Sequence, residues 1–311
     1  MPDREKSGAD RWFRLFVLAV ASVIPLLCVL YFLVLSDKSW PTLKAYGLGF
    51  LTGPSWNPFG GVFGALPMIY GSLVTSAIAL LLGVPISVGV AVFLSEISPG
   101  RLMRPVSFLV EMLAAVPSVI YGLWGIFVLV PLLRSDVYPA LHTYLGFLPL
   151  FQGNIYGFGV LTAGIILAIM IIPIVSSISR DALQAVPDSQ REALYALGGT
   201  RSEVIRTAVL GYARPGVIAA VFLGFGRAFG ETMAVTMLIG NTAQISASLF
   251  APGYTLASLI ANQYSEAVTP LYISALIEIG LVLLLVSFAA NLAGQLLVRR
   301  FVGSQRGGAP A

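Results

Sequence analysis

The chain has 311 residues, of which 57% are hydrophobic and only 10% are charged, and its formal net charge is +4. Soluble domains average about 25% charged residues, so this composition excludes a soluble fold and indicates an integral membrane protein. Long unbroken apolar runs, rather than alternating ones, favour an all-α bundle of membrane helices over a β-barrel.

Six apolar runs are long enough to cross a membrane. The first covers residues 13–35, about 35 Å at 1.5 Å per residue, and a hydrocarbon core is about 30 Å thick. The other predicted spans are residues 66–95, 106–133, 157–179, 216–241 and 271–298. Membrane helices tolerate the kinks expected at four prolines inside these runs, Pro25, Pro85, Pro117 and Pro173.

The first run is too long for the apolar part of a cleaved signal peptide. Residues 36–40 also offer no small-x-small cleavage site, so we expect a retained signal anchor. Lys and Arg are unequally divided: the N-terminus, second loop, fourth loop and C-terminal tail hold 14, and the opposite loops hold three. The positive-inside rule therefore predicts that both termini are cytoplasmic. Topology explains the basic charge, and no nucleic acid need be invoked.

Few side chains are available for covalent or metal chemistry. With one cysteine, Cys28, and one histidine, His142, the sequence excludes a disulfide framework and a Cys/His metal site. No lysine follows a glycine, so the phosphate loop that ends in Gly-Lys is also excluded. We therefore expect no catalytic residue, no metal and no cofactor bound by this chain, and any ATP must bind to a partner.

Residues 180–215 predict two helices too short to span. Pro187 and Asp188 suit the start of the first helix, and Gly198-Gly199 suits its end. Thr200 and Glu203 form a capping box that opens a second helix. One interpretation is a solvated loop that only enforces topology. The other is an ordered knob that enters a groove on a partner through three apolar residues, Ala193, Leu194 and Leu197.

Four ionisable residues lie within or near the ends of the predicted spans: Glu111, Arg227, Glu231 and Glu278. A charge at mid-bilayer is costly and needs a partner or water. Arg227 and Glu231 are four residues apart, which predicts that they share one helix face. They could be polar contacts between helices. We favour an anion route, in which the Arg227 guanidinium binds phosphate or carboxylate oxygens. Glu231 would lower the affinity for the anion, so that it can be released.

The segment Glu192-Ala193-Leu194, with Gly198 four residues later, resembles the EAA loop of ABC importer permeases. Leu replaces the second Ala of that motif, and residues 208–211 read A-V-L-G where the family has I-x-L-P. Residues 226–235 read G-R-A-F-G-E-T-M-A-V, and Gly240-Asn241 follows. These, with F-G-A-L-P at 63–67 and A-V-P-S-V-I-Y-G at 115–122, are similar to the permeases of phosphate-specific ABC importers, over about residues 60–300.

The resemblance implies an all-α membrane protein with the type I ABC importer permease fold. Residues 1–65 would form the anchor helix and an external loop, 66–300 the permease domain, and 301–311 a cytoplasmic tail. It implies a bacterial inner membrane and four kinds of partner: the lipid bilayer, a sister permease (PstA type), two ATPase subunits (PstB type) that bind ATP and Mg, and an external phosphate-binding protein (PstS type). The residues implied by the resemblance are Arg227 and Glu231 for translocation, and Glu192, Ala193 and Gly198 for ATPase docking. Glu111, Ser118 and Glu278 are secondary candidates.

Other functions remain open at this point. The chain could be the sister permease subunit, or a permease for sulfate or molybdate, because an arginine offers these anions the same charge and donors. It could also be a secondary transporter or channel that works alone, with the Arg227–Glu231 pair as a relay. The chain could also be chiefly a regulatory membrane partner in phosphate sensing, which would show binding but no flux of the ion across the membrane.

Overall fold

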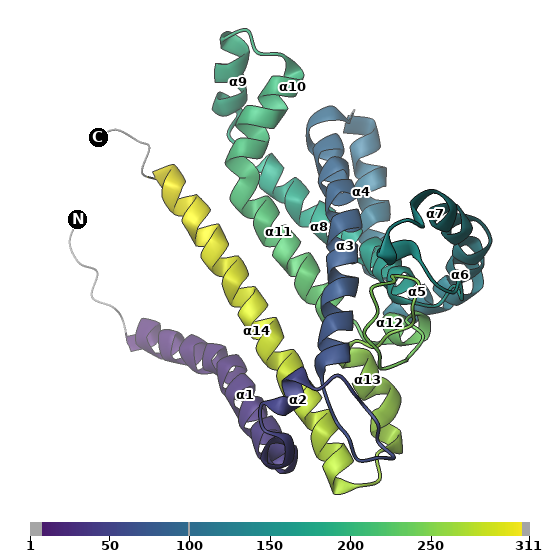
Figure 1. Ribbon diagram of the computed structural model, residues 1–311. Coiled ribbons are helices and arrows are strands. Elements are labelled where there is room, and N and C mark those ends of the chain that lie inside the picture. Colours follow the sequence, from purple (N-terminus) through teal and green to yellow (C-terminus); the bar gives the residue numbers. More distant parts are fainter. Residues whose placement is uncertain (1–7, 99, 307–311) are drawn as a thin grey trace.

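The computed structural model describes residues 8–98 and 100–306, and these form a bundle of helices without a β-sheet (Figure 1). Arg4 and Lys6, counted above for topology, and residues 307–311 of the expected tail lie outside the described residues. Within the described part, six helices are long and apolar enough to cross a membrane, as predicted: Trp12–Tyr46, Leu66–Ile97, Ser118–Leu145, Val160–Gln184, Arg201–Gly230 and Pro270–Arg299.

The helices follow one another with few loops. The first half of the chain holds α1 (Gly8–Tyr46), α2 (Gly49–Thr52), α3 (Leu66–Val92), η1 (Phe93–Ile97), α4 (Gly100–Ala114), α5 (Ser118–Trp124), η2 (Gly125–Leu129), α6 (Val130–Leu132), η3 (Leu133–Val137), α7 (Tyr138–Leu145) and η4 (Pro149–Phe151). The second half holds α8 (Val160–Gln184), α9 (Asp188–Ala196), α10 (Arg201–Glu203), η5 (Val204–Val209), α11 (Leu210–Gly230), α12 (Met233–Leu238), α13 (Leu256–Gln263), η6 (Tyr264–Glu266) and α14 (Pro270–Arg306).

Helix α8 lies at the centre of the bundle and packs against α3 and α11. Small residues allow α3 and α8 to approach closely: a β-carbon at Gly164 would meet Ile78, and one at Gly83 would meet Ile171. Close approach through small residues is how membrane helices gain packing energy, because lipid supplies no hydrophobic force between them. The α3–α8 pair is therefore the closely packed centre of the bundle.

A second close contact joins α3 to the segment before α13. Leu256 donates its backbone N–H to Ser72 Oγ at 2.9 Å, and a β-carbon at Gly71 would overlap the carbonyl oxygen of Tyr254. We expect Gly71→Ala to force the two backbones apart and to destabilise the protein by about 1–3 kcal/mol, measured as a lower Tm in detergent. Gly89→Ala is the matched control, because this position on α3 has open space. Equal Tm values for the two variants would contradict the close contact.

The predicted third span, 106–133, begins too early. In the structure α4 is a separate helix that packs on α8, the helical path breaks at residues 115–117, and the span begins at Ser118. Pro117 causes the break, because it adopts an extended conformation and disfavours helix in the residue before it. The apolar surface of α4, including Phe108 and Leu109, lies on one face of an amphipathic helix and does not belong to the span.

The first and last spans are longer than predicted. Helix α1 continues to Tyr46, so the expected external loop begins eleven residues later, and α14 extends to Arg306. The two helices meet near the C-terminal end of α1, where Thr42 donates its backbone N–H and its hydroxyl to Ser274 Oγ (3.2 and 2.8 Å). Residues 12–34 of α1 are exposed throughout, so this part of the helix has no cover within its own chain.

Candidate functional site

Arg227 and Glu231 lie on either side of a helix break, so the prediction that they share one helix face is wrong. Helix α11 ends at Gly230, and Glu231 has an extended backbone (φ −68°, ψ 130°). The predicted span 216–241 is accordingly divided between α11 and the short helix α12. It also starts earlier than predicted, because the second helix of the knob runs without interruption through Pro215 into α11.

The break places each charge at a favourable helix end. Arg227 lies in the last turn of α11, and Glu231 lies just before α12, where its Oε1 accepts a hydrogen bond from the backbone N–H of Ala234 (3.4 Å). A cation is stabilised at a helix C-terminus and an anion at an N-terminus. An Arg-before-Glu order is poor within one helix but is the favourable order across a junction between two helices.

Helix α12 packs against α5, which brings together two of the segments that carry the resemblance, residues 115–122 and 226–235. A β-carbon at Gly122 of α5 would lie 2.5 Å from Met237 Sδ and 3.2 Å from Ala234 Cα. Tyr121, next to it, lies within electrostatic range of Arg227. Ser118, a secondary candidate, is half-buried at the first position of α5. The 115–122 segment therefore supports the junction that presents the two charges.

The Arg227 side chain is exposed, and among the described residues it makes neither a hydrogen bond nor an ion pair. A charged group on a membrane-spanning helix is costly if it faces lipid. The exposed guanidinium therefore needs water or another subunit beside it. Its free donors match the forked geometry with which arginine binds carboxylate and phosphate oxygens.

The two secondary carboxylates have different surroundings. Glu111 is on α4, outside the spans, and pairs with Arg180 of α8 at 3.3 Å, with a side chain that is 56% exposed. Glu278 of α14 is 5% exposed, and its Oε2 has no hydrogen-bond partner among the described residues. It lies one turn from Ser274, on the side of α14 that meets α1. Among the described residues, neither carboxylate forms a hydrogen bond or an ion pair with Arg227.

The knob formed by α9, α10 and η5 projects from one end of the bundle, opposite α13 (Figure 1). As predicted, α9 (Asp188–Ala196) starts after Pro187, and the Gly198-Gly199 pair follows its last residues. Gly198 has φ +83°, and its N–H bonds the Tyr195 carbonyl while the Gly199 N–H bonds the Leu194 carbonyl (2.9 and 3.0 Å). This is the Schellman ending, in which glycine is favoured because the left-handed conformation strains other residues.

The predicted capping box is also present. Thr200 accepts a hydrogen bond from the Glu203 backbone N–H, and the Glu203 carboxylate accepts one from the Thr200 N–H at 2.7 Å. The backbone N–H of Thr200, followed by its hydroxyl, holds the pKa of Glu203 below its ordinary value. This contribution to knob stability is present at neutral pH and is lost as pH falls through the lowered pKa.

We expect Thr200→Ala to loosen the knob locally, at a cost of about 1 kcal/mol, because the capping hydroxyl is removed. Amide hydrogen exchange would then be faster in residues 200–209 and unchanged in α8. Ser202→Ala is the control, since Ser202 contacts the Thr200 hydroxyl but accepts no helix N–H. Equal exchange rates for both variants would show that the box does not stabilise this helix.

The surface of the knob separates its residues into two groups. Leu194 packs on an apolar cluster beneath the knob that includes Leu183, Val186 and Val204. The residues expected to dock are exposed, and Leu197 is the most prominent, at 84% exposure: Glu192, Ala193, Leu197 and Gly198. A hollow of about 370 Å³ lies beside Leu197 and Gly198. The knob thus offers a shaped and uncovered surface to a partner, while Leu194, contrary to expectation, faces its own core.

Sequence reasoning missed Glu96 and Arg191, which form a close ion pair between η1 and α9 (2.9 Å). A signal was available for Glu96. It is an acidic residue at the C-terminal end of a helix, where the helix dipole disfavours negative charge, and it opens a loop that is otherwise basic. A carboxylate in that position needs a cationic partner. The sequence does not say which of several arginines supplies it.

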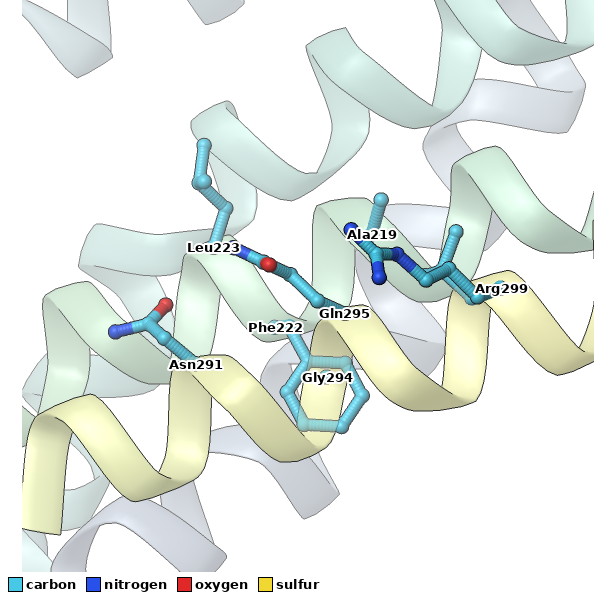
Figure 2. Close-up of a pocket in the computed structure, with 8 residues that line it drawn as sticks. Ala219, Phe222, Leu223, Asn291, Gly294, Gln295 and Arg299 are labelled. Atoms are coloured by element: carbon cyan, nitrogen blue, oxygen red, sulfur yellow. The ribbon is translucent and has the colours of Figure 1, made fainter.

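A groove of about 410 Å³ separates α11 from the end of α14 on the knob side. Figure 2 shows the Phe222 ring against α14 at Gly294, and three polar residues of α14 at intervals of four, Asn291, Gln295 and Arg299, that point toward α11. Neither Arg227 nor Glu231 lines this groove. The groove is therefore separate from the α11–α12 junction that carries the candidate translocation residues.

Comparison with known proteins gives the family. Residues 83–303 match the family described as "Binding-protein-dependent transport system inner membrane component". A phosphate transport system permease protein PstC of Mesorhizobium japonicum is 48% identical over 254 residues, which are 80% of this chain and 78% of the relative. One from Xylella fastidiosa is 44% identical over 302 residues, 96% and 93% of the two chains. The chain belongs to the PstC family of ABC importer permeases.

The family extends to archaea: a probable PstC of Methanocaldococcus jannaschii is 37% identical over 93% of both chains. Solved structures agree with the PstC-family fold. An inward-facing MetNI methionine ABC transporter chain has a TM-score of 0.55 and 19% identity, and covers 75% of this chain and 94% of its own. A chain of a bacterial alginate ABC transporter has a TM-score of 0.57 and 15% identity, and covers 95% and 98%.

As a PstC-family protein with six apolar helices, the chain is a multi-pass protein of the inner membrane and has the type I importer permease fold. In the described residues, no group of three His, Cys, Asp or Glu side chains is arranged to hold a metal ion. The site is built from one exposed arginine, one capping carboxylate and a projecting knob. These features are typical of a protein that binds partners and transmits movement.

Proposed function

We propose that this chain is one of the two permease subunits of an ATP-driven importer that moves inorganic phosphate across the inner membrane. The observation that carries the proposal is the family membership, since relatives named as phosphate transport permeases are 37–48% identical over most of the chain. The sister permease, two ATPase subunits and an external phosphate-binding protein would complete the complex, and ATP and Mg would bind to the ATPases.

The knob would lie in the cytoplasm, together with both termini. Most lysines and arginines flank the knob end of the spans, which supports this orientation through the positive-inside rule. The α13 end and the connection from α1 to α3 would then face outward, toward the binding protein. Residues 1–65, 66–300 and 301–311 would be the anchor with its external loop, the permease domain and the cytoplasmic tail.

Arg227 and Glu231 would face the translocation pathway between the two permeases. Arg227 is thirteen residues beyond Arg214 on α11, about 20 Å at 1.5 Å per residue, so it lies well inside the membrane. A water-filled pathway would remove the cost of the exposed charge and leave its donors free for an anion. Glu231 would limit how tightly the anion binds, which favours release.

Glu192, Ala193 and Gly198 would dock on an ATPase subunit. The exposed end of α9, the hollow beside Leu197 and the rigid glycine ending support a helix-in-groove contact. Closure of the ATPase pair would move the two knobs together and bias the spans between inward-open and outward-open states.

Phosphate uptake by the reconstituted complex in liposomes tests the proposal. Uptake should require ATP, the ATPase subunits and the external binding protein, and sulfate or molybdate should not replace phosphate. Uptake by this chain without ATPase subunits would indicate a secondary transporter or channel instead. ATP-dependent uptake of another oxyanion would keep the importer and change its substrate.

A further inference from the structure

Both helices of the knob contact a single residue, Glu96, at the knob end of the second span. Arg191 of α9 binds the Glu96 carboxylate with two donors, Nη2 to Oε1 at 2.9 Å and Nε to Oε2 at 3.4 Å. Arg201 of α10 donates to the Glu96 backbone carbonyl. Glu96 thus connects η1 and α3 to the part of the knob that would dock on the ATPase.

The Arg191–Glu96 pair is well sheltered, since the two side chains are 18% and 11% exposed. Arg191 also donates to the backbone carbonyls of Leu183, in the last turn of α8 (3.1 Å), and Val186, just before α9 (2.6 Å). It pairs with Asp188 at 3.1 Å. The hydrogen bond to Glu96 is the main reason why the pKa of Arg191 is raised above its ordinary value. Forked, partly buried pairs of this kind fix geometry, whereas exposed pairs contribute little.

An apolar cluster beneath the pair holds the knob to the bundle. Ala91 of α3, Leu183 of α8 and Val204 of η5 belong to this cluster. Apolar contacts are not directional, so they attach the knob without fixing its rotation against α3. The Arg191–Glu96 pair and the Arg201 contact supply that orientation.

Helix α3 leads from Glu96 to the opposite side of the membrane. Its 27 residues span about 40 Å, and its far end is joined to the segment before α13 through Gly71 and Ser72. Movement of Glu96 would therefore pass through η1 and along α3 to the side where the binding protein would dock.

We propose that Arg191 and Glu96 are positioning residues that transmit movement of the knob to the second span. The proposal rests on the proposed function, because it takes the knob to be the ATPase contact. Arg201 assists through the backbone carbonyl of Glu96, and this contact survives any change of the Glu96 side chain. The expected defect on breaking the pair is loss of coupling: ATP is hydrolysed, but phosphate is moved poorly.

The test compares Glu96→Gln, Arg191→Gln and the charge-swapped pair Glu96→Arg/Arg191→Glu in the full complex reconstituted in liposomes. The quantity measured is phosphate taken up per ATP hydrolysed. We expect each single variant to assemble with the ATPases and to lower this ratio about tenfold, and the swapped pair to recover part of it. Asp181→Asn is the control, because it removes the exposed Arg180–Asp181 pair nearby and should leave the ratio within twofold of wild type.

Three results are decisive. A lowered ratio in assembled single variants, with recovery in the swapped pair, supports the proposal. An unchanged ratio overturns the proposal. It is also overturned if the single variants and Arg191→Lys lose assembly, with uptake and hydrolysis falling in parallel. In either case the pair is a purely structural contact. Absence of ATP-dependent uptake in the wild-type complex contradicts the proposed function itself, and so separates the two failures.

Discussion

Replacing Arg227 with glutamine is expected to lower ATP-dependent phosphate uptake about tenfold to hundredfold while the complex still assembles. The side chain is exposed and makes no ion pair within the described chain, so its removal leaves no uncompensated partner that would unfold the protein. A hydrogen bond from a charged donor contributes about 1.5–3 kcal/mol, which corresponds to that range of uptake. Initial uptake rates in liposomes, at saturating ATP and binding protein, measure the effect.

Two further variants separate charge from geometry at this position. Arg227→Lys keeps the charge but loses the forked donors, so it should give an intermediate rate. Arg134→Gln removes a second exposed arginine, on η3 and outside the candidate pathway, and should transport at nearly the wild-type rate. Uptake that survives in Arg227→Gln would leave the importer assignment intact and reduce Arg227 to a charge that stabilises the end of α11.

Glu192→Lys is expected to abolish most phosphate-stimulated ATP hydrolysis, because it reverses a charge on the exposed surface of α9 that we propose docks on the ATPase. Like charges set against each other at an interface cost several kcal/mol, so a hundredfold loss is the expected scale. The chain should still insert and pair with its sister subunit, since Glu192 has no buried contact. ATPase activity of the complex, with and without phosphate-loaded binding protein, is the measurement.

Asp181→Lys makes the same change of charge at an exposed position on α8 outside the knob surface, and should leave stimulation close to wild type. Glu192→Gln should be milder than Glu192→Lys, because it removes a charge without introducing repulsion. Stimulation that is unaffected in Glu192→Lys, with assembly intact, would remove α9 from the ATPase contact.

Features set by short stretches of sequence were predictable. The number of spans follows from apolar runs, and both ends of α9 follow from Pro187 and the Gly198-Gly199 pair. The Thr200–Glu203 capping box is equally local, because its partners are three residues apart. In each case the interaction that fixes the structure lies within a few residues, so no tertiary information is needed.

Features set by tertiary contact were not predictable in the same way. The break at Glu231 was missed because G-E-T reads as part of a continuous apolar run, and only the packing of α12 on α5 requires the turn. Pro117 was interpreted as a kink, whereas it separates an amphipathic helix from a span. Glu96 and Arg191 are 95 residues apart, and nothing local selects one arginine among those near the knob.

The contact between Thr42 and Ser274 has a consequence for biogenesis. These residues are 232 positions apart, and at about 5–20 residues per second the ribosome needs roughly ten to fifty seconds to make the intervening chain. During that interval α1 has entered the bilayer without its own-chain partner. Its apolar surface on every side lets lipid act as its solvent for that time. Helix α1 can therefore dock on α14 only after the chain between them has been made, although it precedes every other described span in the sequence.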